Sequence, residues 1–115
     1  MAKFALFVFN GDPMCFVHVL LNAFDMKEKG HEAAIVIEGA ATKLLPSLEA
    51  KENPLHYLWV KAKEQNLVAG VCKACSSKMG TLEVAKKIGL SLLDDMNGHP
   101  GMASFYKKGF TIITF

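Results

Sequence analysis

Two cysteines three positions apart, Cys72 and Cys75, are the residues of this sequence best suited to chemistry. They follow directly on the apolar run 67–71, which is typical of a buried strand. A thiol between a strand end and a helix start faces unpaired backbone amides and the positive end of the helix dipole, and Lys73 and Lys78 add positive charge. These surroundings favour the thiolate, so we expect Cys72 to act as a nucleophile.

The two-residue spacer between these thiols is compatible with three kinds of chemistry. It permits ring closure, and therefore thiol–disulfide exchange between Cys72 and Cys75. It equally suits a sulfur carrier, in which one thiolate holds a persulfide and passes the outer sulfur on. A zinc or iron–sulfur site needs about four ligands. Because Cys15 and the scattered histidines form no second pair along the chain, we expect no metal.

Other polar residues follow the predicted strands, and ligands of open parallel sheets gather beyond the strands' carboxyl ends. These residues are Asn10, Asp12, Glu38, Asp94, Asp95 and His99. His99 lies in a glycine-flanked loop, where it would either stabilise or protonate a thiolate or simply cap the loop. For the acidic residues we expect structural roles: Asp12 as a helix N-cap, Glu38 as a solvated strand end, and the Asp94–Asp95 pair as a strand terminus followed by an N-cap.

Composition and charge exclude several classes of function. The chain has 115 residues, of which 51% are apolar and 21% charged, so we expect a single domain spanning residues 1–115 with its own core. The net charge is +2, and all thirteen basic residues are lysines spread singly or in pairs, which disfavours a nucleic-acid partner. No G-x-x-x-x-G-K-[ST] or G-x-G-x-x-G motif is present, so we expect no nucleotide or flavin cofactor.

Cysteine usage and hydropathy bear on the compartment. Three cysteines in an odd, widely spaced set do not form the disulfide framework of a small secreted protein. Only six apolar residues follow Lys3 before turn residues, too few for a signal peptide, and no apolar stretch is long enough to span a bilayer. We therefore expect a cytoplasmic protein without a membrane partner. We also expect Cys15 to be buried in an apolar helix.

The apolar runs and turn residues predict the elements that must position the thiols. Strands are predicted over 4–9, 33–37, 67–71, 90–93 and 110–115. Helices are predicted over 13–29, 42–49, 53–62, 81–88 and 100–108, with one or two helical turns over 73–79. Because strand and helix alternate, the connections should be right-handed parallel crossovers. The expected fold is α/β: a single-domain, flavodoxin-like, mostly parallel five-stranded sheet with helices on both faces.

The segment from Gly70 to Gly80 resembles the active-site segment of the DsrE/DsrF/TusD-type sulfur-relay proteins. In that family a cysteine at the end of the third strand is followed eight residues later by a glycine, with basic residues just before the glycine. Cys72, Lys78 and Gly80 match this pattern, and the chain from 98 to 113 resembles the family's closing helix and strand. The sequence departs from the pattern in having Cys75, in lacking arginine beside the glycine, and in its Asp94–Asp95 pair.

The resemblance implies a small DsrE-like protein that acts as an intracellular sulfur carrier or cysteine-dependent sulfurtransferase. It implies a persulfide on Cys72, donor and acceptor proteins for sulfur, and homo-oligomers such as trimers or hexamers. Cys72, Cys75, Lys78 and His99 are the candidate site residues, without a metal or cofactor. Two alternatives stay open: a thiol–disulfide redox protein using Cys72 and Cys75, and a non-catalytic oligomeric binding protein with inert cysteines.

Overall fold

Five parallel strands form the centre of the molecule, in the sheet order β4-β3-β2-β1-β5. The computed structural model describes all residues from 1 to 115. Its strands are β1 (Lys3–Val8), β2 (Glu32–Ile37), β3 (Val68–Cys72), β4 (Leu92–Leu93) and β5 (Thr111–Thr114). The arrangement confirms the predicted single-domain α/β class with a parallel five-stranded sheet and fits a flavodoxin-like fold.

Most helices lie where glycine, proline and capping residues predict them, but the helix predicted over 42–49 is a 3₁₀ helix followed by a short α-helix, and the one predicted over 53–62 begins only at His56. They are α1 (Pro13–Glu28), the short 3₁₀ helix η1 (Gly39–Leu44), α2 (Leu45–Glu49), α3 (His56–Glu64), α4 (Lys73–Lys78), α5 (Leu82–Lys87) and α6 (Met102–Lys107). Asp12 caps α1 as expected, because its side chain accepts a hydrogen bond from the Met14 amide ahead of a first-turn proline. None of these helices is long and apolar enough to cross a membrane.

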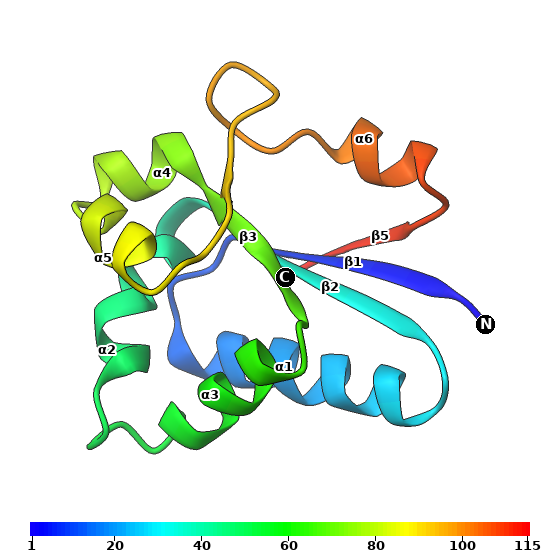
Figure 1. Ribbon diagram of the computed structural model, residues 1–115, viewed down its shortest axis with the longest axis horizontal. Coiled ribbons are helices and arrows are strands. Elements are labelled where there is room, and N and C mark those ends of the chain that lie inside the picture. The colour runs from blue at the N-terminus through cyan, green and yellow to red at the C-terminus, as the bar shows by residue number, and fades with distance from the viewer.

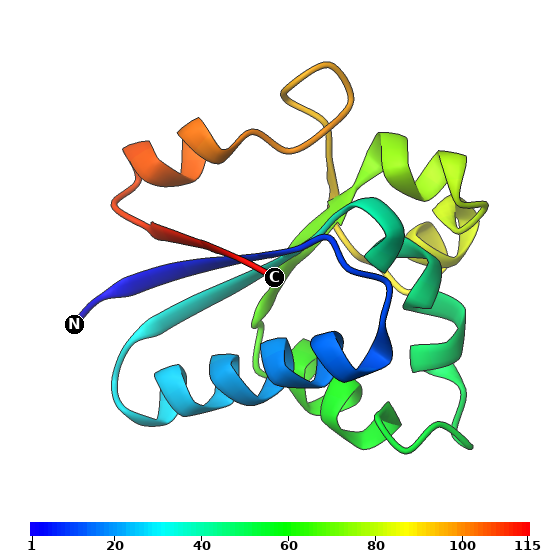
Figure 2. The same ribbon diagram turned by 180° about the vertical axis from the view of Figure 1, so that it is seen from behind.

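The two faces of the sheet are covered unequally. Figures 1 and 2 show α1 and α3 on one face and α6 alone on the other. Steps from β1 to β4 run in one direction across the sheet, and the return to β5 reverses it, so right-handed crossovers put α6 on the opposite face. The first face holds a core of 18 buried residues and the second a cluster of four. Both faces carry helices, as predicted.

β1 shows why the sheet interior was recognisable from sequence. Residues 5 to 8 are fully buried, and they alternate between the two clusters: Leu6 and Val8 belong to the large core, Ala5 and Phe7 to the small one. A strand covered on both faces needs apolar residues at every position, which is the unbroken run that the sequence contains.

The carboxyl ends of the strands bring three segments together. In Figure 1, α4 and the loop between β4 and α6 lie at the same end of the sheet, beyond β3. The residue after β2 begins the turn into η1, and α4 packs against η1. Because parallel strands all end at one edge, side chains that are far apart in sequence meet there.

Candidate functional site

The junction between β3 and α4 positions both thiols. Cys72 is the last residue of β3 and the N-cap of α4, with extended backbone angles (φ −64°, ψ 120°). The chain then turns helically, so Cys75 returns over Cys72, and the Cys75 amide donates a hydrogen bond to Cys72 Sγ at 3.3 Å. The spacing of the two cysteines therefore has a local structural basis: the first thiol caps the helix that carries the second.

A tight turn after β4 carries the histidine. Met96 and His99 exchange two backbone hydrogen bonds, of 2.7 and 3.0 Å, around Asn97 and Gly98. Both central residues have positive φ (51° and 91°), the combination that a type I′ turn requires and that Asn-Gly favours. The Gly98 carbonyl accepts a hydrogen bond from the Ala74 amide at 2.9 Å, which ties the turn to the first turn of α4.

Four side chains converge at this point, and we call them the Cys–His–Glu cluster: Glu38, Cys72, Cys75 and His99. His99 Nδ1 lies 3.0 Å from Cys72 Sγ and 3.5 Å from Cys75 Sγ. One ligand-type atom of each residue lies within 4.8 Å of those of the other three. The cluster thus combines two thiols, an imidazole and a carboxyl group from three separate strand ends, and it brings together three of the four predicted site residues.

Glu38 is the member whose role sequence reasoning missed. The expectation of a solvated strand end is wrong, because Glu38 is only 6% exposed. It immediately precedes η1, which packs against α4, and the Thr42 hydroxyl of η1 donates to the Cys75 carbonyl at 3.3 Å. No cation pairs with Glu38, and burial raises its pKa to about 7. Its place after a central strand was the available signal, but burial depends on the packing of α4.

The prediction that the Cys72 thiolate is favoured is also wrong. Cys72 is fully buried. Burial raises the pKa of Cys72 to about 12, and the hydrogen bond from the Cys75 amide offsets this only in part. The helix that was expected to favour the thiolate, α4, has only six residues. Lys73, which was expected to add positive charge, forms a salt bridge with Asp94 at 3.7 Å, and both side chains are about half exposed. The surroundings of Cys72 therefore disfavour its thiolate rather than favour it.

The remaining candidates lie outside the cluster. Lys78 is exposed in the last turn of α4 and forms no salt bridge. The Asp95 carboxylate accepts a hydrogen bond from the Gly101 amide at 2.9 Å and so holds the loop that carries His99. Cys15, expected to be buried, is partly exposed on α1. The structure thus separates one isolated thiol, Cys15, from the adjacent pair Cys72 and Cys75.

Access to the cluster is restricted. Glu38 and Cys72 are buried, whereas Cys75 and His99 are partly exposed. None of the five surface cavities is lined by a cluster residue; the one lined by Asp94 and Asp95 measures about 310 Å³ and opens beside α6. Within the cluster, Cys75 and His99 are therefore the two members that solvent reaches.

Comparison with known proteins places the chain among archaeal relatives. No family model and no solved structure matches it. It is 34% identical over 97 residues to the uncharacterized protein MJ0733 of Methanocaldococcus jannaschii, a match that covers 84% of this chain and 77% of the relative. It is 48% identical over 40 residues to an uncharacterized protein of Archaeoglobus fulgidus, covering 35% of this chain and 66% of that relative. The identity and coverage of the first match show that the chain belongs to the family of MJ0733.

Proposed function

We propose that the protein is a sulfur carrier that holds a persulfide on Cys72 and relays the outer sulfur to an acceptor. The observation that supports this most is the contact of Cys72 Sγ with His99 Nδ1 at 3.0 Å, at the end of the third strand. The resemblance of residues 70–80 to DsrE/DsrF/TusD-type sulfur-relay segments points to the same chemistry.

His99 has a specific role in this proposal. Because burial raises the pKa of Cys72, its attack on a donor persulfide needs a base within hydrogen-bond reach, and His99 Nδ1 lies in that position. Cys72 Sγ forms a bond to the donor's outer sulfur, the donor's S–S bond breaks, the donor leaves as a thiolate, and the thiol proton moves to His99. An acceptor thiolate then attacks the outer sulfur on Cys72, which releases the Cys72 thiolate to recover its proton. Nothing is oxidised overall.

Cys75 favours a second candidate function, thiol–disulfide redox chemistry. Its amide already contacts Cys72 Sγ, and the two sulfur atoms lie within 4.8 Å of each other. Cys75 Sγ can attack the inner sulfur of a Cys72 persulfide, releasing hydrosulfide and leaving a disulfide that an external dithiol must reduce. The same pair could also pass two electrons to a disulfide substrate without any persulfide.

Mass spectrometry after treatment with cysteine persulfide tests the main proposal. We expect about 32 Da to be added to Cys72, with Cys15→Ser loading normally as a matched thiol control and Cys72→Ser not loading. Cys75→Ser should abolish disulfide cycling but leave loading of Cys72 largely intact. A label found only on Cys75, or no label while iodoacetamide modifies Cys72, would show that sulfur carriage on Cys72 is wrong.

The partners and compartment belong to the same proposal. All three cysteines are free thiols, which supports a reducing compartment such as the cytoplasm. Exposed Lys78, beside the thiols in sequence, is available to an acidic donor or acceptor protein. The trimer or hexamer implied by the family resemblance stays a prediction; light scattering should give a mass three or six times that of the 12.6 kDa chain.

A further inference from the structure

We propose that Glu38, Cys72, Cys75 and His99 bind one Zn²⁺ ion in a tetrahedral site. The proposal goes beyond sulfur carriage and does not depend on it, because it requires only the positions and types of these four side chains. It also reverses the expectation drawn from the sequence, in which one C-x-x-C without a second pair disfavoured a metal.

The distances within the cluster are close to those of a zinc site. Bond lengths of about 2.3 Å to sulfur and about 2.0 Å to nitrogen place the sulfur and nitrogen ligands of a tetrahedral zinc about 3.5 Å apart. The distance from Cys75 Sγ to His99 Nδ1 is 3.5 Å, and that from Cys72 Sγ is 3.0 Å. All four ligand atoms lie within 4.8 Å of one another. The two sulfur–nitrogen distances are therefore within about half an ångström of tetrahedral spacing, and ligand atoms as far apart as 4.8 Å would close by about 1 Å, shared between two side chains.

The backbone holds the ligands in place before any ion arrives. The Cys75 amide orients Cys72 Sγ, as a hydrogen bond to a ligand thiolate does in metal sites. The turn that carries His99 is closed by two hydrogen bonds and tied to α4 by the bond from Ala74 to Gly98. Glu38 follows β2 directly and precedes η1, which packs against α4. Such preorganisation lowers the cost of gathering four ligands around one ion.

The charge environment supports a cation at this position. Glu38 is a carboxyl group that is 6% exposed, and none of the four salt bridges of the protein includes it. Burying an unpaired carboxylate is costly, and buried charges are normally paired or coordinate metals. Two thiols and an imidazole are soft or borderline ligands, which favour zinc over magnesium or calcium. Bound Zn²⁺ would also displace the protons of both thiols.

Cobalt and zinc titration of the reduced, chelator-treated full chain tests the proposal. One equivalent of Co²⁺ should give thiolate-to-cobalt charge-transfer absorption together with the intense visible bands of tetrahedral cobalt, and one equivalent of Zn²⁺ should remove both. Bound Zn²⁺ should protect Cys72 and Cys75, but not Cys15, from alkylation. Absence of the tetrahedral bands, or protection that includes Cys15, would overturn the proposal.

Two variants and two matched controls assign the ligands. Glu38→Gln, which removes a buried charge and should fold, is expected to weaken Zn²⁺ binding by at least about tenfold. Cys75→Ser should lose about half or more of the charge-transfer absorption. Cys15→Ser and Glu49→Gln change a thiol and a carboxyl group outside the cluster and should bind zinc as the native chain does. Unchanged affinity in Glu38→Gln would overturn the four-ligand site, whereas persulfide loading of the metal-free protein tests sulfur carriage separately.

Discussion

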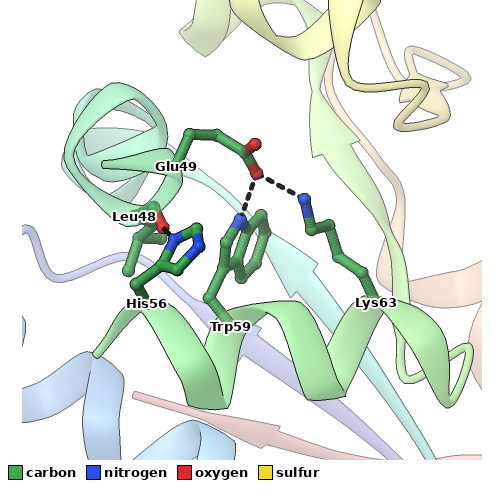
Figure 3. A network of polar contacts seen from close by, with 5 residues as sticks. All are labelled: Leu48, Glu49, His56, Trp59 and Lys63. Atoms are coloured by element: carbon green, nitrogen blue, oxygen red, sulfur yellow. Dashed lines mark hydrogen bonds and ion pairs between the residues drawn. The ribbon is translucent and has the colours of Figure 1, made fainter. Parts of the chain in front are cut away.

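Glu38 is buried and Glu49 is partly buried, but only Glu49 has partners that compensate its charge. Glu49, at the end of α2, accepts hydrogen bonds from the Trp59 indole at 2.6 Å and from the Lys63 ammonium group, both on α3 (Figure 3). Beside them His56 Nδ1 donates to the Leu48 carbonyl at 2.8 Å. This network joins two helices of the large core, and its role is structural.

The two carboxyl groups respond to burial in opposite ways. Burial by itself raises the pKa of Glu49, but the hydrogen bonds from Lys63 and Trp59 outweigh it and hold the pKa below its usual value. Burial raises the pKa of Glu38 to about 7, and nothing opposes it. An uncompensated acid beside two thiols and an imidazole, at the carboxyl edge of a parallel sheet, is typical of a functional site. The contrast separates a carboxyl group whose charge is compensated by its neighbours from one whose charge is not.

The largest expected effect comes from His99. Because His99 Nδ1 is the base within reach of the Cys72 thiol, His99→Asn should slow persulfide loading of Cys72 by about a hundredfold at neutral pH. Its free energy of unfolding should change little, since the turn is held by backbone bonds. Loading rates followed by mass spectrometry measure the first effect and urea denaturation the second. Equal loading rates in the variant and the native chain would remove His99 from the chemistry.

Glu38→Gln should stabilise the metal-free protein at high pH. The folded pKa of about 7 exceeds the ordinary value of 4.5, so between these values the native state binds more protons and stability falls as pH rises. The variant should therefore be more stable at about pH 8, by up to about 3 kcal/mol, and equal to the native chain at about pH 4. Urea denaturation across this range, with chelator present, measures the difference. A variant less stable than the native chain at high pH would mean that Glu38 has a compensating partner after all.

Lys63→Met should lower the stability of the protein, whereas Glu38→Gln should raise it. It leaves the partly buried Glu49 without its cation, so we expect a loss of about 1.5 kcal/mol at neutral pH. The lowered pKa of Glu49 means that the native pairing stabilises above the unfolded pKa and is lost as pH falls, so the gap should narrow in acid. Urea denaturation at neutral and at acid pH measures this difference in stability. Persulfide loading of Cys72 should be unchanged. A parallel loss of loading would contradict the separation of the two regions.

We expect the smallest effect from Ser76→Ala, which compares a buried hydroxyl group that has no hydrogen-bond partner with one that has a partner. The Ser76 hydroxyl on α4 is buried without a hydrogen-bond partner, so its removal should raise stability by about 0.5–1 kcal/mol. Thr42→Val is the matched control, because the Thr42 hydroxyl donates to the Gly39 carbonyl at 2.8 Å and its loss should destabilise. Thermal unfolding measures the change in stability of both variants. A destabilised Ser76→Ala variant would show that the Ser76 hydroxyl has a partner in the native chain.

The elements of the fold could be predicted from sequence because their signals are local. The run around Leu6 contains the fully buried residues 5–8 of β1, and Asp12 with Pro13 begins α1 as the pattern predicts. Gly30 and Gly89, at the ends of two predicted helices, both adopt positive φ. Backbone hydrogen bonding within a few residues determines such features, so the residue types report them directly.

The site could be predicted only in part. The amino-acid sequence by itself determined the strand–helix junction at Cys72, the return of Cys75 one turn later and the Asn-Gly turn before His99, because each depends on neighbouring residues. Only the tertiary structure decided that Glu38 is buried, that burial raises the pKa of Cys72 and that the four side chains meet. Burial and electrostatics sum over atoms from distant segments, and at this sheet edge those segments are adjacent only once the strands have paired.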